Sequence, residues 1–263
     1  MRRATAALAL AVVGAYAGFA SAAPIDHPMP SDWSFTLGAG ALLTPSYPGA
    51  ASTKVVPLPF VDVRYKDRIF LSPIAGLGVN VLAVPGARLG VSLLPDLGRS
   101  ASQGNRLRGW GDISAGADVK LFGELRVLGP LAVLASVRRQ LGGGNGAVVD
   151  AGLTGTLPLM RRLIVSATAT VSWANGRYTQ SYFGVGADQS AAALLQGSLV
   201  PTFAAGAGLR DASLGMLAIV PIDRHWSVNS IVRTEVLLGD AATSPLTERR
   251  FQLTFGGFLG YRF

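Results

Sequence analysis

Side chains that commonly carry catalysis or bind metals are scarce in this sequence. It contains no cysteine and two histidines, His27 and His225. A phospholipase or a protease needs a nucleophile held beside a base, or a pair of positioned acids, and no such motif surrounds either histidine. Without a cluster of His or Cys, the sequence offers no zinc-type metal site. We therefore expect no enzymatic activity, no catalytic residues, no metal and no cofactor.

Charged residues that could act together lie on segments in which polar and apolar residues alternate. On the polar face of such segments acidic and basic side chains would pair, because buried charges need partners. A pair of carboxylates that performs acid catalysis is the alternative interpretation, but no nucleophile accompanies it. The expected inward-facing charges are Arg88, Asp112, Asp118, Lys120, Arg138, Asp150, Arg233 and Glu235.

The segment that best defines the environment of these charges is residues 249–263, which read RRFQLTFGGFLGYRF. Every second residue back from Phe263 is apolar except for one glycine, and the interleaved residues are mostly small or polar. A period of two indicates a β-strand between two different environments. Aromatic rings at both ends with aliphatic residues between them are typical of a strand that crosses a bilayer. The segment therefore predicts the closing strand of an outer-membrane β-barrel.

The composition of the whole chain agrees with such a barrel. Hydrophobic residues make up 49% and charged residues 14%, yet no apolar run of about 18 residues occurs beyond the N-terminus, which excludes helices as spanning elements. The formal net charge is +8, but the basic residues are scattered singly, so no binding of nucleic acid is expected. A glycine-rich stretch, GGGNG at residues 142–146, joins two predicted strands without a following helix. This favours a hairpin turn over a phosphate-binding loop.

Alternating segments separated by turn-rich stretches recur along the chain. Short polar turns alternate with longer loops, as in outer-membrane barrels with short periplasmic turns and longer external loops. The count predicts an all-β fold, a transmembrane antiparallel up-and-down barrel of about twelve strands, with about ten to fourteen left open. Closure should pair the last segment with the first and set Gly256 and Gly260 opposite Gly38 and Gly40. The predicted strands cover residues 31–43, 54–65, 69–84 as two short strands hinged at 73–76, 87–96, 109–124, 131–141, 147–159, 162–174, 203–221, 226–238 and 251–263.

The first residues predict export from the cytoplasm. Two arginines at positions 2 and 3 precede an apolar stretch at residues 6–19, and the small residues Ala20, Ser21 and Ala22 follow. This order is the pattern of a cleaved secretory signal peptide. We expect a signal peptide at residues 1–22, a short periplasmic segment at 23–32 and the barrel at 33–263.

Large aromatic residues provide a check on this topology. Trp33, Trp173, Trp226 and Tyr65 fall at predicted strand ends and on the apolar parity, where amphipathic rings favour the membrane–water interface. Trp110 departs from that parity, so we expect it above the membrane or pointing inward.

Several stretches of the sequence resemble the MipA/OmpV family of outer-membrane proteins. The resemblance implies a barrel of the twelve-stranded type, in contact with outer-membrane lipid and lipopolysaccharide. It also implies that the terminal residues Phe263, Tyr261 and Leu259 form the signal read by the barrel-assembly machinery. Asn145 departs from the family pattern, in which we expect a histidine. The matching stretches are PLPFVDVRYKDRIFLS, LRGWGDISAGADVKLFGEL, RQLGGGNGAVVDAGLTGTLPL, WANGRYTQSYFGV, LLGDAATSP and GGFLGYRF.

The resemblance also implies a function. One type of member is described as a scaffold that joins a lytic transglycosylase to a murein synthase, and we expect this role here. A porin-like channel for small solutes and a surface adhesin are the alternatives. A scaffold would use the periplasmic turns, and the expected contact residues are Lys66, Arg68, Arg161, Arg162 and Arg224.

The assigned faces also predict the cost of two neighbouring substitutions. Val232→Arg on the lipid face should cost about 2–4 kcal/mol near the membrane midplane. Arg233→Ala on the inner face should cost clearly less.

Overall fold

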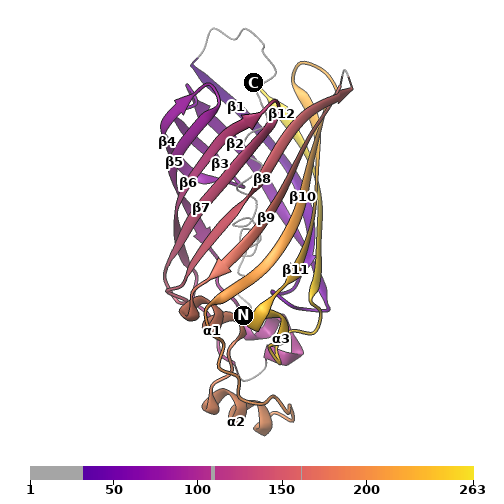
Figure 1. Cartoon of the computed structure of the whole chain (residues 1–263). Helices are drawn as coiled ribbons and strands as arrows, with labels where there is room; N and C mark the ends of the chain where they lie inside the picture. Colours follow the sequence, from indigo (N-terminus) through magenta and orange to yellow (C-terminus); the bar gives the residue numbers. More distant parts are fainter. Residues whose placement is uncertain (1–31, 108–109, 161) are drawn as a thin grey trace.

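The computed structural model describes residues 32–107, 110–160 and 162–263. They form a closed antiparallel barrel in which each strand pairs with the next and the first pairs with the last (Figure 1). This confirms the predicted fold and its count of twelve strands. The predicted signal peptide, residues 1–22, lies outside the described residues. The strands are β1 (Trp33–Pro45), β2 (Thr53–Tyr65), β3 (Ile69–Ser72), β4 (Gly76–Val84), β5 (Ala87–Asp96), β6 (Gly116–Leu128), β7 (Leu131–Leu141), β8 (Ala147–Met160), β9 (Leu163–Ala174), β10 (Gly208–Pro221), β11 (Trp226–Leu237) and β12 (Phe251–Arg262).

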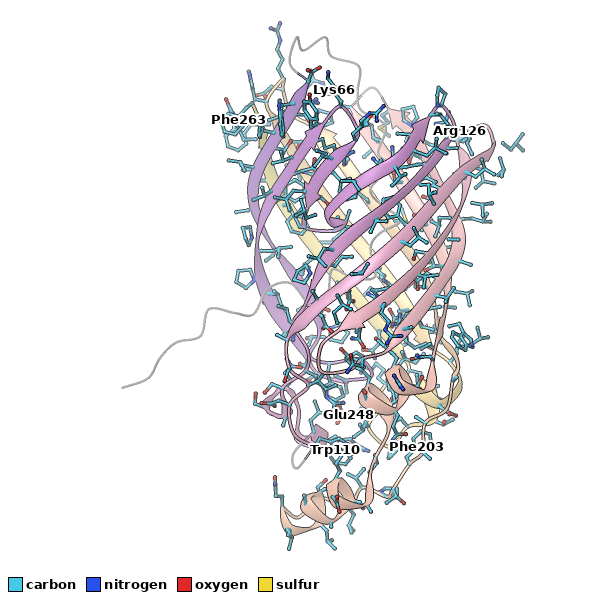
Figure 2. All side chains as sticks on the ribbon, turned by 90° about the vertical axis from the view of Figure 1, so that its left-hand side faces the viewer. Lys66, Trp110, Arg126, Phe203, Glu248 and Phe263 are labelled. Atoms are coloured by element: carbon cyan, nitrogen blue, oxygen red, sulfur yellow. The ribbon has the colours of Figure 1, made fainter. Side chains whose placement is uncertain are left out.

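The alternation of the terminal segment becomes the two faces of β12. Leu253 and Phe255 point outward and are 48% and 51% exposed, whereas Gln252 and Thr254 point inward and are 6% and 7% exposed. Figure 2 shows side chains covering the outside of the whole wall. An apolar outer face suits lipid, and the inner face must then solvate its own polar groups.

The seam between β1 and β12 closes through small residues. Gly38 lies opposite Gly260 as predicted, but Phe258 lies opposite Gly40, and Leu42 opposite Gly256. The prediction for Gly40 was therefore wrong. A glycine pairs with a large residue here for a steric reason. A Cβ on Gly40 would lie 2.5 Å from Cδ1 of Phe258, so only glycine leaves room for that ring.

Two strands begin later than the sequence predicts. β6 starts at Gly116 and not at residue 109, because Ile113 and Arg99 exchange backbone hydrogen bonds of 2.7 and 3.0 Å in the loop. β10 starts at Gly208 and not at residue 203, because Phe203 forms an isolated bridge with Val185. In both places the alternating sequence pattern begins several residues before the strand joins the barrel wall.

The long loops are more ordered than the sequence predicts. The stretch between β9 and β10 contains the helices α1 (Gly176–Phe183) and α2 (Ala187–Leu195), and α3 (Gly239–Thr243) lies between β11 and β12. Two 3-10 turns, η3 (Ala101–Gln103) and η4 (Asn105–Leu107), lie between β5 and β6. Within the described ranges, no helix is long and apolar enough to cross a membrane.

The long loops pack together into a cap over one end of the barrel. We call this end the loop end and the opposite end, with the short turns, the turn end. Figure 2 places Trp110 and Glu248 at the loop end and Lys66 and Phe263 at the turn end. The cap holds two apolar clusters, one around Tyr47, Leu107, Trp110, Val185 and Leu246, and one around Val148, Tyr178, Phe183, Leu237 and Ala241. The cap is thus a small hydrophobic core outside the wall.

Candidate functional site inside the barrel

An irregularity in β10 brings two adjacent charged residues to the inside of the barrel. The register of β10 against β9 shifts between Leu209 and Asp211, which marks a β-bulge. A bulge inserts one unpaired residue and breaks the alternation of faces. As a result Arg210 and Asp211 are both buried, at 7% and 0% exposure.

These two residues start a network of ion pairs across β10 and β11. The Arg210 guanidinium contacts the Asp211 carboxylate. Arg233 Nη2 lies 3.7 Å from Asp211 Oδ1 and 2.7 Å from Glu235 Oε2. Arg210 also donates a hydrogen bond of 3.0 Å to the hydroxyl of Tyr178, and its guanidinium lies 5.3 Å from the centre of that ring. The network therefore joins the wall to helix α1 of the cap.

A second group of charges continues the network over β6 to β9. Arg138 Nε lies 3.5 Å from Asp118 Oδ2. Ser172 shares its hydroxyl between Asp150, at 2.8 Å, and Asp211, at 3.2 Å, and Ser136 donates to Asp150 at 3.0 Å. Basic and acidic side chains thus lie next to one another across this wall, and each offsets part of the cost of burying its neighbour.

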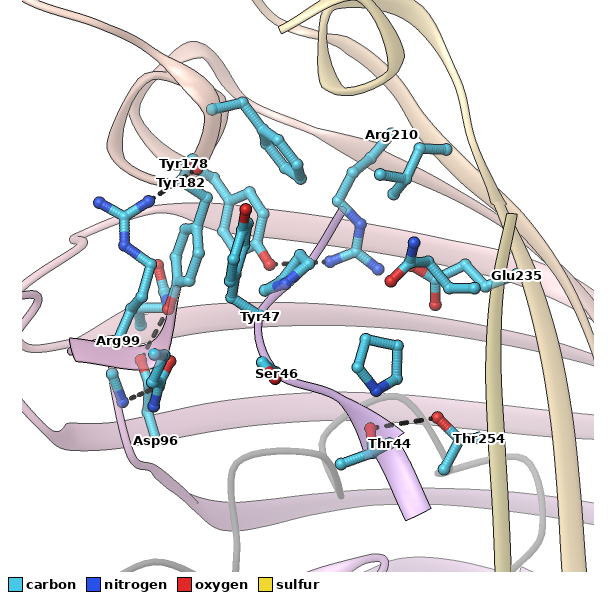
Figure 3. Close-up of a pocket in the computed structure, with 18 of the residues that line it drawn as sticks. Thr44, Ser46, Tyr47, Asp96, Arg99, Tyr178, Tyr182, Arg210, Glu235 and Thr254 are labelled. Atoms are coloured by element: carbon cyan, nitrogen blue, oxygen red, sulfur yellow. Dashed lines mark hydrogen bonds between the residues drawn. The ribbon is translucent and has the colours of Figure 1, made fainter. Parts of the chain in front are cut away.

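A cavity of about 190 Å³ lies between this network and the cap (Figure 3). Stacked rings of Tyr178 and Tyr182, 4.6 Å apart, form part of its wall. Gln140 donates to Asp96 Oδ2 at 2.8 Å and to the Tyr182 hydroxyl at 3.0 Å. The Arg99 side chain enters from the loop between β5 and β6 and donates to the Tyr182 carbonyl at 2.9 Å. The cavity is therefore a polar chamber closed by aromatic residues.

Burial in the cap changes the acidity of the groups around this chamber. Burial raises the pKa of the Tyr47 hydroxyl to about 12, with the negative charge of Glu248 adding to the effect. Burial also raises the pKa of Tyr182 and lowers that of the Arg99 guanidinium. The two phenols therefore stay neutral hydrogen-bonding groups at physiological pH.

An apolar cluster occupies the side of the lumen formed by β1, β2 and β11. Leu42, Val56, Leu58 and Ile231 are buried together, and Ile74, Leu217 and Phe258 pack against them. On the inner face of their strands, Leu42, Val56 and Ile231 are each two residues away from a polar residue of the chamber. These polar neighbours are Thr44, Lys54 and Arg233, respectively. The lumen thus combines a polar chamber at the loop end with an apolar cluster beside it on β1, β2 and β11.

Most of the charges predicted to face inward do so. Asp118, Lys120, Arg138 and Arg233 are buried on the inner face. Asp150 and Glu235 belong to the ion-pair network, and Arg88 lines a small cavity near the turn end together with Lys120. Asp112 was predicted wrongly. It is exposed in the loop before β6, where its carboxylate accepts a hydrogen bond of 2.7 Å from the amide of Ala101.

The predicted interface aromatics gather at strand ends on the outer face. Trp33 packs on Tyr65, with 4.7 Å between ring centres, at the turn end. Trp226 and Phe263 both contact Tyr261, at 5.0 and 4.9 Å. Trp173, at the loop end of β9, is 42% exposed. Leu259, the third residue of the predicted assembly signal, also points outward and is 45% exposed.

The predicted contact residues lie in turns at the turn end. Lys66, Arg68, Arg162 and Arg224 are exposed, whereas Arg161 lies outside the described residues. The carboxylate of Asp223 accepts hydrogen bonds from the amides of Trp226, at 2.7 Å, and His225, at 2.8 Å, and these bonds lower its pKa. They fix the turn that presents Arg224.

Sequence reasoning missed several residues of the chamber. Arg210 and Asp211 were missed because a bulge is not visible in a pattern of alternation. Arg99, Tyr178 and Tyr182 lie in segments interpreted as loops and reach the chamber only because the cap folds inward. The Asn175 side chain accepts a hydrogen bond of 3.0 Å from the Tyr178 amide and caps helix α1. Asparagine is a preferred N-cap residue, so this position is a sequence signal that could have revealed the helix.

The chemistry available in the chamber is binding by charge and hydrogen bonds. Ser172 faces carboxylates and no histidine, and His225 stacks on Tyr261 in an exposed turn at the other end of the barrel. Within the described part of the chain, no group of three or more His, Cys, Asp or Glu residues could hold a metal ion. The arrangement can hold an ion or a polar group, and it contains no paired nucleophile and base of the kind needed for hydrolysis.

Comparisons with known proteins agree with the fold. A solved bacterial polysaccharide outer membrane secretin superimposes with a TM-score of 0.50 at 9% identity, and the match covers 90% of this chain and 100% of that chain. The outer membrane channel DcaP of Acinetobacter baumannii gives a TM-score of 0.41 at 8% identity, over 88% and 96% of the two chains. At 9% identity the secretin match is informative for the fold alone, and the fold assignment does not rest on the DcaP match. No curated protein matches the sequence.

A family comparison is more specific. The model of the family described as MltA-interacting protein MipA matches residues 37–263, which is nearly the whole barrel from β1 to the end of the chain. Because this match spans most of the sequence and the fold is a closed outer-membrane type of barrel, the chain belongs to the MltA-interacting protein MipA family and is an outer-membrane β-barrel protein.

Proposed function

We propose that this protein is a non-enzymatic scaffold in the outer membrane that binds murein-processing enzymes, a lytic transglycosylase and a murein synthase, at its periplasmic face. Membership in a family described as interacting with MltA is the observation that carries this proposal. The turn end is the periplasmic face, since outer-membrane barrels place their short turns there.

The turn end offers an exposed basic surface with a fixed shape. Lys66 projects from a tight turn and its Nζ lies 3.1 Å from Asp32 Oδ2. Arg162 donates to the carbonyl of Ile222 at 3.4 Å, which links two neighbouring turns. Arg68 and Arg224 carry further exposed charges. Such a surface favours an acidic patch on a partner, and the association should weaken as salt screens the charges.

Features of the lumen argue against the channel alternative. The cap covers the loop end, ion pairs occupy the wall of β10 and β11, and the apolar cluster around Leu58 narrows the lumen beside β1 and β2. A channel for small solutes needs a continuous aqueous path. Conductance of the refolded mature chain in a planar bilayer tests this alternative directly, and solute-selective single-channel currents would support it over the scaffold.

The scaffold is tested by capture of enzymatic activity. The refolded mature barrel is immobilised, incubated with envelope extract at low salt, washed and assayed for release of soluble muropeptides from purified murein. We expect murein-degrading activity to be retained and then eluted by salt. A barrel that retains no such activity at low salt would contradict the proposal.

Charge reversal locates the contact surface. The triple variant Lys66→Glu, Arg68→Glu and Arg224→Glu should retain on the order of tenfold less activity, equivalent to about 1.4 kcal/mol. The matched control reverses Arg177, Arg249 and Arg250, which are exposed at the opposite end of the barrel. Equal losses in both variants would show that total charge, and not the periplasmic turns, governs retention.

A further inference from the structure

The barrel wall is interrupted between β2 and β5. β2 pairs with β1 along its whole length, but it pairs with β3 only through Val63, Arg64 and Tyr65. β5 pairs with β4 no farther than Leu93. The short hairpin of β3 and β4 therefore starts at the turn end and stops well short of the loop end. No described strand pairs with residues 53–62 of β2 or 94–96 of β5 on the sides that face each other, and we call this interval the wall gap.

Prolines remove the backbone donors that would point into the wall gap from β2. The Lys66 amide donates to Asp32 on the β1 side, whereas the Tyr65 carbonyl accepts from Arg68 on the β3 side. In an antiparallel strand the N–H and the C=O of one residue point to the same neighbouring strand, and those of the next residue point to the strand on the other side. Odd-numbered residues of β2 therefore face the gap, and Pro57 and Pro59 are among them.

The opposite edge has the same feature. A Cβ on Gly76 of β4 would lie 2.2 Å from the Leu93 oxygen, so the peptide groups of Leu93 face β4. Pro95 has the parity of Leu93 and lacks the N–H that would face the gap. Unpaired donors are strongly unfavourable at membrane depth. Prolines on both edges therefore suit an edge that stays unpaired in the folded barrel.

The wall gap is bounded by fixed structure at its loop-end side and at its turn-end side. On the loop side, Tyr47 and Leu107 pack in one apolar cluster, and Tyr47 donates to the Leu246 carbonyl at 3.3 Å. On the turn side, Ser72 Oγ accepts from the amides of Ile74, at 3.2 Å, and Ala75, at 3.0 Å, and holds the end of the hairpin. The gap is thus a window with a defined frame.

Behind the window lies the chamber. Lys54, on the inner face of β2, and Pro95, on the outer face of β5, line the same cavity of about 190 Å³. Because Pro95 lies on the unpaired edge of β5, the cavity extends to the wall gap. Leu42, Val56 and Leu58 pack against one another on the inner faces of β1 and β2 at 1–3% exposure and do not line this cavity.

Two basic side chains line the chamber behind the window. Arg99 is 4% exposed, and its Nε has no hydrogen-bond partner in the described part of the chain. Lys54 points to the same cavity. Neither forms an ion pair within 4.0 Å with an acidic group that the structure describes. Among the charged residues that line the chamber, basic side chains outnumber acidic ones, with Lys54, Arg99, Arg138, Arg210 and Arg233 against Asp96, Asp118 and Glu235. A chamber with an excess of basic side chains behind an edge of exposed prolines is complementary to an amphiphile with an acidic head group.

We propose that the wall gap admits a fatty acid from the membrane into the barrel. The acyl chain lies in the gap against Pro57, Pro59 and Pro95, which are exposed on its two edges, and the carboxylate is bound by Lys54 and Arg99. This site is separate from the periplasmic turns, so the barrel can bind a fatty acid whether or not it acts as a scaffold.

Binding of dodecanoate to the refolded mature barrel in lipid nanodiscs tests the proposal. We expect saturable binding above the level of empty nanodiscs, and weaker binding of dodecanol, which has no charge. Lys54→Ala combined with Arg99→Ala should weaken binding of dodecanoate on the order of tenfold and leave dodecanol unchanged. The absence of saturable binding, or equal affinity of the wild type for the acid and the alcohol, would overturn the proposal.

A second variant tests the route through the wall without relying on a mutated interior. The chain has no cysteine, so Pro59→Cys, at an exposed position on the edge of the gap, can be labelled with a bulky maleimide after folding. The label should weaken binding on the order of tenfold or slow it to a similar extent. The unlabelled variant and labelled Val137→Cys, on the lipid face of β7, are the controls. Unchanged rate and affinity after labelling at Pro59→Cys would show that dodecanoate does not enter here.

Discussion

Replacement of Arg233 by methionine should strongly destabilise the barrel. Arg233 is 5% exposed and contacts Glu235 at 2.7 Å and Asp211 at 3.7 Å. Methionine keeps most of the length of the side chain, so the change removes charge and hydrogen bonds more than packing. Breaking a buried ion pair from one side typically costs about 3–5 kcal/mol, because the remaining charge stays buried without its partner.

This expectation reverses the order that the sequence predicts. Val232→Arg, on the outer face, should still cost about 2–4 kcal/mol, but removal of Arg233 is now expected to cost as much or more. The reason is that Arg233 neutralises two acidic side chains from β10 and β11. A sequence pattern places the residue on the inner face without revealing what it contacts there.

Urea-induced unfolding in lipid vesicles measures these costs, with tryptophan fluorescence and the heat-modifiable band as independent readouts. Arg233→Met combined with Glu235→Gln should cost less than the sum of the single variants, with a coupling of about 1–3 kcal/mol. Arg249→Met, at an exposed site of the loop end, should change stability by no more than about 0.5 kcal/mol. Arg233→Met would refute the reasoning if it cost less than about 1 kcal/mol and its cost added to that of Glu235→Gln without coupling. That result would mean that the charges are hydrated and do not depend on one another.

Three further predictions concern the cap, the seam and assembly. The pKa of Tyr47 is raised to about 12 in the folded cap, so the contribution of its neutral hydroxyl to the stability of the cap is complete below about pH 10 and is lost as the pH rises towards 12, a change of about 2–3 kcal/mol. The rate of proteolysis of the external loops should rise over that range, and Tyr47→Phe should remove this pH dependence. Gly38→Ala places a Cβ 2.2 Å from the Leu259 oxygen and should destabilise the seam by about 1–3 kcal/mol in urea titrations, whereas Gly257→Ala, with no atom within 4 Å, should be nearly neutral. Deletion of Phe263 should leave refolding in detergent largely intact and strongly reduce the heat-modifiable band in cell envelopes; equal losses in both assays would mean that this ring acts only through packing.

The strands and their faces could be predicted from the sequence alone. Residues 251–263 alternate because lipid outside and polar groups inside impose opposite requirements on successive residues. The hinge at residues 73–76 was also predictable, because Pro73 and Gly76 interrupt the alternation, and it separates β3 from β4 as expected. Both features depend on neighbours in the chain, so a local pattern is enough to reveal them.

Features that depend on residues distant in the chain required the tertiary structure. Alternation could not show the bulge that turns both Arg210 and Asp211 inward, since it depends on the register of β10 against β9. It placed Asp112 inside the barrel because the alternating pattern begins before the first residue of β6.

The chamber and the wall gap are the clearest examples of this limit. The sequence shows Pro57, Pro59 and Pro95, but only the pairing of the strands shows that all three face one opening. Arg99 enters the chamber from a loop whose path is set by contacts in the cap. Periodicity thus determined which face of each strand meets lipid, whereas closure of the barrel and packing of the loops decided what fills its interior, because those contacts join residues that no local pattern relates.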